Sequence, residues 1–522
     1  FVLAIIIVSS CTDDFEELNT KPDELIADNV GTNQLGQALA QSQYHGLMIL
    51  SWRHQISQSL FADLYAQYFA TTASNFDSDQ HLEVGRWIDL GWTSFYGNAA
   101  PQLDFVEKTT REQGLVVQNA IANVWKVTVF HRITDYWGPI LYSEFGNGES
   151  VVNYDTQESV YKDFFIVLDE AVATLKDNVG GNAFGSNDIV YGGDVAKWLT
   201  FANSLRLRLA MRIRYVEPQL AQQEAEKAIQ DGVMTTNADN ANVLTTPDNR
   251  NPYFTITDWG EFRMSAAMES VMNGFEDPRI GEFFSPAVNA QGDDGPFQGL
   301  HNGIPKPQKN TPVLNGIASD MAPKFLNGNR GGTNPDWSVM HASEVALLQA
   351  EGALIGWDMG GGTAKNFYEQ GIRLSLEDRT NASAQEIDDY ITSTNKPRAV
   401  TGEQFEFNNL PPLSDIPVAF DESAGQERKL EQIITQKWIA LYPNGMEAFA
   451  EVRRTGYPDL YPIIESLNPD VPEDEIIRRF TFVSSEDQNN PEGVNAARQM
   501  EELTSRGGDK NSTHLWWDAK NQ

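Results

Sequence analysis

The sequence predicts a mainly α-helical protein, built as a scaffold of tetratricopeptide-like helical pairs with an irregular, loop-rich lobe packed on it. Apolar residues recur every three to four positions in several separate segments, which is the spacing of one face of an α-helix. Between these segments the composition changes. Residues 285–335 hold eight Gly and seven Pro, which excludes a long helix there, while their aromatic residues indicate packing as an ordered lobe.

The first half of the chain contains four such helical segments, at residues 33–72, 115–136, 157–175 and 195–213. The first keeps helical spacing from Leu35 to Phe69 and is interrupted only near Gly46. Gly138-Pro139 ends the second segment, because proline lacks the N–H group that would continue a helix. We therefore expect long helices joined by short connections.

Shorter helical runs follow in the second half, at residues 343–356, 364–376, 428–442 and 446–454. The first two are separated by Gly360-Gly361-Gly362 and together match the length of about one tetratricopeptide unit. The repeat signature is incomplete, so we expect degenerate helical pairs and not a regular array.

These segments give an expected layout for the whole chain. Residues 1–11 form a signal-peptide remnant and lipidation site, 12–32 a tether, and 33–522 a single domain. Within that domain the helical scaffold covers about 33–250, 338–380 and 427–456, and the irregular lobe covers about 251–337, 381–426 and 457–522.

The N-terminal residues resemble a bacterial lipoprotein export signal. Phe1 to Val8 form an apolar run that is too short to span a bilayer, and Ser9, Ser10 and Cys11 follow it. Cys11 is the only cysteine in the chain, and its position predicts acylation and attachment to a membrane. The acidic residues after it resemble the surface-export signal of Bacteroidota lipoproteins.

Charge and motifs exclude several classes of function. The formal net charge of −35 repels phosphate backbones, so no nucleic acid is expected as a partner. Zinc-binding, nucleophile-elbow and Walker-type motifs are absent, so we expect no cofactor, no metal and no catalytic residues. Four arginines crowd one helix (Arg206, Arg208, Arg212 and Arg214), and we expect them, like Arg453 and Arg454, to form ion pairs with acidic helices.

Several sequence blocks together resemble the SusD/RagB family, in its SusD-like branch. The blocks are Asp14 to Pro22, Val124 to Tyr142, Lys197 to Arg214, Asp277-Pro278-Arg279, Ser343 to Glu351, Gln436 to Pro458, and Arg478 to Glu486. The resemblance covers nearly all of residues 11–517. It implies an extracellular, outer-membrane lipoprotein that binds nutrients without catalysis. It also implies a partner, a SusC-like TonB-dependent transporter whose mouth this protein would cap.

The ligand site cannot be carried over from the family blocks, so we predict it from physical chemistry. Flat aromatic rings in loops can cover the apolar face of a sugar, and polar neighbours can bond its hydroxyl groups. Three clusters fit this description. They contain Phe76, Asp77 and Trp87; Asp258, Trp259 and Arg263; and Trp337.

We therefore expect a surface lipoprotein that binds an oligosaccharide and delivers it to the transporter. Two alternatives remain open at the level of sequence. The same scaffold could bind peptides in a helical groove, or a pair of carboxylates could make the protein a surface glycoside hydrolase.

Overall fold

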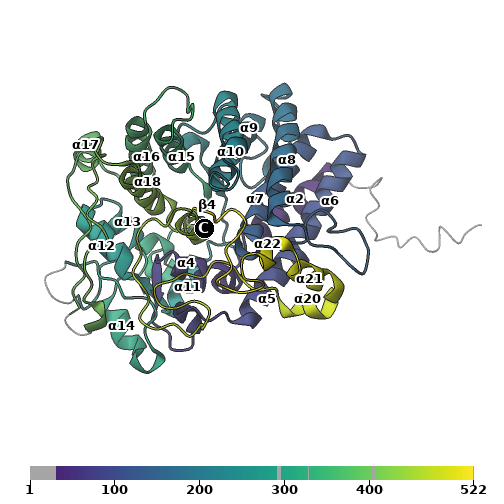
Figure 1. Cartoon of the computed structure of the whole chain (residues 1–522). Coiled ribbons are helices and arrows are strands. Elements are labelled where there is room, and N and C mark those ends of the chain that lie inside the picture. The colour runs from purple at the N-terminus through teal and green to yellow at the C-terminus, as the bar shows by residue number, and fades with distance from the viewer. Residues whose placement is uncertain (1–30, 291–294, 327, 403–405, 521–522) are drawn as a thin grey trace, which may run out of the picture.

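The computed structural model describes residues 31–290, 295–326, 328–402 and 406–520, and it confirms the mainly α-helical fold class (Figure 1). The expected lipidation site at Cys11 and the tether lie outside the described residues. None of the helices within the described ranges is both long and apolar enough to cross a bilayer.

The helical scaffold is built from pairs of consecutive helices. In the described part of the chain the pairs are α7 (Val116–Trp137) with α8 (Gln157–Asp177), α9 (Val195–Arg212) with α10 (Pro218–Asp231), α15 (Ala342–Leu354) with α16 (Ala364–Arg379), and α18 (Gln426–Leu441) with α19 (Gly445–Thr455). Helix α8 also packs on α9, and α15 packs on α18, so the pairs join into one body (Figure 1). The predicted helical segments from residue 115 onward agree with these bounds to within a few residues.

Local sequence explains where these helices begin and end. The side chain of Asp194 accepts hydrogen bonds from the backbone N–H groups of Ala196 and Lys197, which caps the start of α9. Thr363 and Asn366 form a reciprocal capping box at the start of α16. Gly456 follows α19 with φ of 78°, a left-handed conformation that glycine adopts without a steric penalty.

The first helical segment is more broken than the sequence predicts. Residues 32–71 fold as α2 (Thr32–Gly46), α3 (Ser51–His54), a π-helical turn η2 (Gln55–Ser59), α4 (Ala62–Tyr65) and strand β1 (Phe69–Thr71). The chain continues through η3 (Asp77–Gln80), α5 (Gly85–Ser94), a second π-helical turn η4 (Phe95–Ala99) and α6 (Ala100–Glu112). Helix α2 packs on α6, and α6 packs on α7.

The lobe consists of short helices and two small antiparallel sheets. Its helices are α11 (Tyr253–Ile256), η7 (Thr257–Trp259), α12 (Ala266–Phe275), α13 (Ile280–Phe283), α14 (Thr311–Ile317), η9 (Pro323–Phe325), α17 (Ala384–Ile391), α20 (Ser484–Asn489), α21 (Pro491–Arg498) and α22 (Glu501–Thr504). Strand β1 pairs with β3 (Phe262–Met264), and β2 (Ala241–Val243) pairs with β4 (Trp337–Met340). Single 3-10 turns lie at η5 (Gly185–Asn187), η6 (Asn237–Asp239), η8 (Lys306–Gln308), η10 (Gly328–Arg330) and η11 (Glu406–Asn408).

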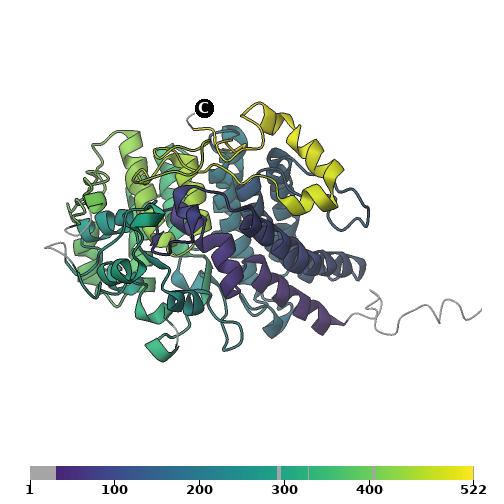
Figure 2. The same cartoon turned by 90° about the horizontal axis from the view of Figure 1, so that it is seen from below.

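The C-terminal segment runs across both the scaffold and the lobe (Figure 2). One cluster of buried hydrophobic side chains contains residues from Ala38 to Trp517, so segments far apart in sequence share this core. At its end, Nε1 of Trp517 donates a hydrogen bond of 2.8 Å to Oδ1 of Asp135 on α7.

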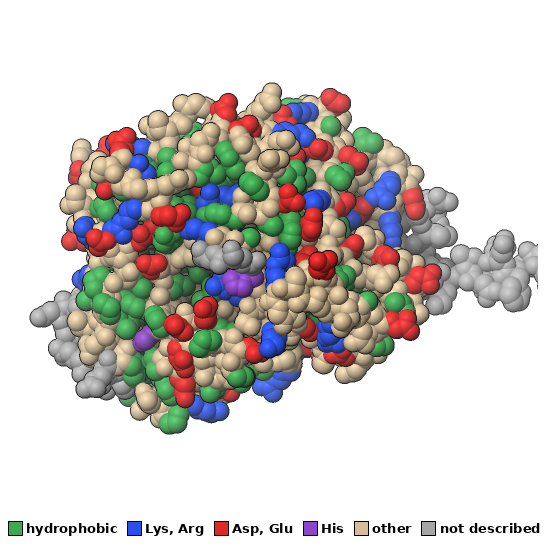
Figure 3. Space-filling model, viewed as in Figure 1, with side chains coloured by type: hydrophobic (Ala, Val, Ile, Leu, Met, Phe, Trp, Pro, Cys, Tyr) green, Lys and Arg blue, Asp and Glu red, His purple; other side chains and the backbone are tan. Residues whose placement is uncertain are grey.

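The expected ion pairs of the arginine-rich helix are confirmed. Arg208 pairs with Glu344 and Arg212 with Glu447, and Arg206 and Arg214 pair with carboxylates of neighbouring helices in the same way. Arg454 pairs with Glu351, whereas Arg453 donates instead to backbone carbonyl oxygens. On the face drawn in Figure 3, acidic and basic side chains are interspersed.

Candidate functional site

The pairing of β1 with β3 brings two of the predicted clusters together. The strands are antiparallel, with Thr71 opposite Phe262, so the segment that leaves β1 lies beside the segment that enters β3. The segment leaving β1 carries Phe76, and the segment entering β3 carries Trp259. Segments separated by almost two hundred positions in sequence therefore lie side by side.

Hydrogen bonds hold these two segments together. Oγ1 of Thr72 donates to Oδ1 of Asn315 at 2.7 Å, and Nδ2 of Asn315 donates to the carbonyl oxygen of Gly260, also at 2.7 Å. Gly260 has φ of 64° and ends the η7 turn directly after Trp259. The position of the Trp259 ring is therefore set by an ordered turn.

A third segment joins the surface through a side-chain pair. Nε2 of Gln55, in the π-helical turn η2, donates a hydrogen bond of 2.5 Å to Oε2 of Glu261. Partial burial raises the pKa of Glu261, and the hydrogen bond from Gln55 acts in the opposite direction. This pair links α3 and η2 to the turn that carries Trp259.

Two tryptophan rings on these segments remain open to solvent. Trp259 is 42% exposed, and Trp52 of α3 is 47% exposed. Trp52 precedes Gln55 by three residues, and Trp259 precedes Glu261 by two. The guanidinium of Arg53 lies 5.2 Å from the centre of the Trp52 ring. We name the set Trp52, Gln55, Asp258, Trp259 and Glu261 the tryptophan surface.

Phe76 and Trp87 lie behind this surface and are not open to solvent. Phe76 stacks on Phe262 with ring centres 6.0 Å apart and meets Trp87 edge-on at 5.7 Å. Their exposed fractions are 6% and 9%. The expectation that Trp87 lies in a loop is wrong, because it belongs to α5, where helical spacing turns its ring toward the core. That Phe76 and Trp87 contact a ligand remains a prediction. Only the small exposed part of each ring could make such a contact.

The polar residues predicted with them have different surroundings. Asp258 is part-exposed and lies 3.5 Å from Arg330. Asp77 is half-buried at the first position of η3. Arg263 is buried, and its Nη1 donates to the carbonyl oxygen of Phe262 at 2.7 Å while lying 3.6 Å from Asp320. Burial lowers the pKa of Arg263, and its contacts hold β3 in place.

Trp337 lies in a different environment from the one that its sequence neighbours suggest. It begins strand β4, so the expectation of a loop is wrong, and only 2% of its surface is exposed. Its ring meets His54 edge-on at 4.7 Å and packs against Tyr253 at 5.8 Å. These contacts make Trp337 a core residue and keep it out of the tryptophan surface.

Sequence reasoning missed Trp52. Trp52, Ile56 and Leu60 are spaced by four residues, so a continuous α-helix would place all three on one buried face. The π-helical turn at 55–59 changes that period and lets Ile56 and Leu60 be buried while Trp52 is exposed. The only available signal was a tryptophan next to an arginine.

No cluster of three or more His, Cys, Asp or Glu side chains within the described ranges could hold a metal ion. The tryptophan surface offers open aromatic faces beside two carboxylates and an amide.

A family model described as SusD-like, Susd and RagB outer membrane lipoprotein, matches residues 17–518. The chain belongs to the SusD/RagB family. This match confirms the resemblance seen in the sequence blocks and covers both the scaffold and the lobe. SusD-like proteins are nutrient-binding proteins of the outer membrane.

Solved structures of SusD-like proteins are similar to this chain over nearly its whole length. A chitin-binding SusD homolog from Flavobacterium johnsoniae has a TM-score of 0.85 and 34% identity, covering 94% of this chain and 99% of that one. Two SusD-like proteins from Bacteroides thetaiotaomicron have TM-scores of 0.83, identities of 32% and 33%, and the same coverage. No curated protein matches the sequence.

Proposed function

We propose that this SusD-like protein binds oligosaccharides on the tryptophan surface and passes them to a SusC-like TonB-dependent transporter. The observation that carries the proposal is the pair of exposed rings of Trp52 and Trp259, each within three residues of one partner of the Gln55–Glu261 hydrogen bond. Aromatic planes can stack on the apolar faces of sugar rings, and the polar groups between them can bond hydroxyl or acetamido groups.

The choice of sugar class is supported by one similar protein. The Flavobacterium johnsoniae homolog is described as chitin-binding, and it shares 34% identity with this chain. Chitin and its oligomers are therefore the first probes. They are uncharged, and a chain with a net charge of −35 does not repel them.

The proposal is tested by retention of the purified protein on a panel of insoluble polysaccharides, including chitin. We expect retention on at least one of them, and we expect Trp259→Ala to reduce it. Ile166→Ala is the matched control, because Ile166 is an exposed hydrophobic residue on α8, outside the tryptophan surface. Retention on no polysaccharide, together with binding of oligopeptides, would replace the proposal with the peptide-binding alternative.

The proposal assigns no catalytic step to the protein. Incubation with the same polysaccharides should therefore release no reducing ends. Release that is lost when one carboxylate is changed to its amide would favour the glycoside hydrolase alternative.

Delivery requires a place at the cell surface and a transporter. We propose that acylated Cys11 anchors the protein to the outer membrane, facing outward, where it caps a SusC-like barrel. Cys11→Ser should release the protein from the membrane fraction, and affinity purification of the anchored protein should retain a TonB-dependent barrel. A barrel that never copurifies with the anchored protein would contradict the delivery role.

A further inference from the structure

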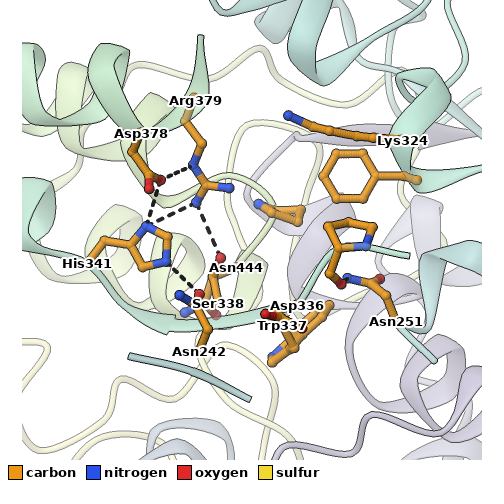
Figure 4. A pocket seen from close by; sticks show the side chains of 13 residues that line it. Asn242, Asn251, Lys324, Asp336, Trp337, Ser338, His341, Asp378, Arg379 and Asn444 are labelled. Atoms are coloured by element: carbon orange, nitrogen blue, oxygen red, sulfur yellow. Dashed lines mark hydrogen bonds and ion pairs between the residues drawn. The ribbon is translucent and has the colours of Figure 1, made fainter. Parts of the chain in front are cut away.

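A cavity separate from the tryptophan surface lies where the scaffold meets the lobe. It has a volume of about 230 Å³ and is lined by residues of β2, η9, β4, the end of α16 and the turn between α18 and α19 (Figure 4). None of its lining residues belongs to the tryptophan surface.

Two cationic side chains share one side of the cavity. Figure 4 shows Arg379 and Lys324 along one side, with Trp337 and Asn251 on the opposite side. Arg379 is the last residue of α16, and Lys324 lies in η9. The rings of Trp337 and Phe325 give the cavity an apolar wall.

The acceptor groups that line the cavity already have donors. Asp378 lies 3.1 Å from Nε of Arg379, and its Oδ1 accepts a hydrogen bond of 3.1 Å from Asn240. Asp336 accepts a hydrogen bond of 2.8 Å from the backbone N–H of Thr245. The carboxylates therefore leave little capacity to accept a donor from a ligand.

The histidine beside them contacts both a carboxylate and the guanidinium. Its Nδ1 lies 3.2 Å from Oδ2 of Asp378 and 3.3 Å from Nη2 of Arg379, and its Nε2 lies 2.9 Å from Oδ1 of Asn242. Burial and the charge of Arg379 lower the pKa of His341, whereas Asp378 raises it. His341 therefore helps to hold the guanidinium in place.

Hydrogen-bond donors that line the cavity, by contrast, exceed the acceptors available to them. Nη2 of Arg379 donates to Oγ of Ser338 at 3.3 Å, whereas Nη1 has no hydrogen-bond partner among the described residues. Nζ of Lys324 lies 3.2 Å from Oε2 of Glu282, which uses one of its three N–H groups. The cavity thus presents unsatisfied, positively charged donors beside an apolar wall.

Burial lowers the pKa of both Lys324 and Arg379, because it disfavours their charged forms. Glu282 opposes this shift for Lys324 and Asp378 opposes it for Arg379, so each cation has one carboxylate partner. An anion in the cavity would bond the N–H groups that these pairs leave over, since charge-assisted bonds are stronger than neutral ones.

We propose that this cavity binds a small organic acid, with the ligand carboxylate held by Arg379 and Lys324 and its apolar part against Trp337 and Phe325. The cavity is smaller than the roughly 300–1,000 Å³ pockets that hold drug-sized ligands, so the ligand is no larger than about one sugar ring. The net negative charge of the chain does not prevent this, because exposed charges beyond about 8 Å are screened at physiological salt.

The test is isothermal titration of the full chain with three separate probes at about pH 7. D-Glucuronate offers a carboxylate on a sugar ring, acetate offers the carboxylate alone, and D-glucose offers the ring alone. We expect glucuronate to bind at least about tenfold more tightly than glucose, and its affinity to fall in about 0.5 M NaCl. Binding of acetate equal to that of glucuronate would keep the site and assign it to small free acids.

Lys324→Gln is the decisive variant, because its partly exposed side chain can be changed without loss of the fold. It should weaken glucuronate binding by at least about fivefold. Lys365→Gln is the matched control, because that exposed lysine on the same helix as Arg379 pairs only with Glu422 at 3.1 Å among the described residues. Three results would each overturn the proposal. They are glucose binding as tightly as glucuronate, no binding of glucuronate or of acetate at all, and unchanged glucuronate affinity in Lys324→Gln.

Discussion

Gln55 donates a hydrogen bond of 2.5 Å to Glu261 and so joins a π-helical turn to the turn that carries Trp259. The bond connects residues from opposite sides of the boundary between helical scaffold and lobe. It joins the segment that carries Trp52 to the turn that carries Trp259.

Gln55→Leu removes the hydrogen bond while keeping the approximate volume of the side chain. We expect a loss of about 1 kcal/mol in the free energy of unfolding, because the part-buried Glu261 loses a donor. We also expect affinity for chitin oligomers to fall about three- to tenfold, since the Trp259 turn is less well held. Titration calorimetry and chemical denaturation measure both effects.

Gln222→Leu is the matched control for that change. Nε2 of Gln222 donates a hydrogen bond of 2.8 Å to Glu226 within α10, remote in sequence from the tryptophan surface. It should leave oligosaccharide affinity unchanged. Wild-type affinity in Gln55→Leu would show that the Gln55–Glu261 pair supports the fold and not the binding surface.

Truncation of Trp337 should lower the stability of the fold, whereas truncation of Trp259 should lower ligand affinity. Trp337→Ala opens a cavity in the core between His54 and Tyr253, and we expect it to cost about 3–5 kcal/mol of unfolding free energy. Trp259→Ala removes a part-exposed ring and should leave the unfolding midpoint nearly unchanged while weakening binding. Denaturation curves of both variants decide this, and a stable Trp337→Ala protein would contradict the assignment of Trp337 to the core.

Glu351 joins two cations of the arginine network. It lies 2.7 Å from both Arg454 and Arg214 and is fully buried. Glu351→Gln leaves two buried cations without this partner, which should cost about 3–5 kcal/mol of unfolding free energy. Glu422→Gln, in an exposed pair with Lys365, should leave the denaturation midpoint unchanged. Similar denaturation midpoints for the two variants would mean that the arginine network contributes little to the stability of the fold.

The same network should make the fold sensitive to acid. Burial alone would raise the pKa of Glu447, but Arg212, Arg208 and Lys437 lower it to about 2. The folded-state pKa is below the ordinary value of 4.5, so this stabilisation is complete above about 4.5 and is lost as the pH falls to about 2.

Urea denaturation across that pH range measures the effect. The free energy of unfolding of the wild type should fall between about pH 4.5 and pH 2, and the slope should be smaller in Glu447→Gln. Glu422→Gln should keep the wild-type slope. An identical slope in Glu447→Gln would place the acid sensitivity elsewhere.

Sequence alone predicted the long helices well, because their signals are local. Helix α9 has an N-cap at Asp194 and apolar residues at helical spacing, and both features act within a few residues. The arginines on that helix could be assigned to ion pairs because the chain is rich in acidic residues, with 73 Asp and Glu against 38 Lys and Arg.

The binding surface was harder to predict, because it depends on long-range pairing and on one irregular turn. Trp337 looked like a loop residue until the pairing of β4 with β2 placed it in the core. Trp52 was not singled out in the sequence, because its exposure depends on the π-helical turn that follows it. Trp259 was proposed as a ligand contact in a loop; it lies in a short turn that ends at a glycine and is exposed, and its contact with a ligand stays a prediction.

The most direct test of the account is isothermal titration of chitohexaose into the wild type and into the Trp52→Ala, Trp259→Ala double variant, with Ile166→Ala as control. We expect the double variant to lose about 4 kcal/mol, or roughly 700-fold in affinity, since aromatic anchors each contribute about 2 kcal/mol or more, while its unfolding midpoint stays close to that of the wild type. Equal affinity in the double variant and the wild type would contradict the assignment of the tryptophan surface as the binding site.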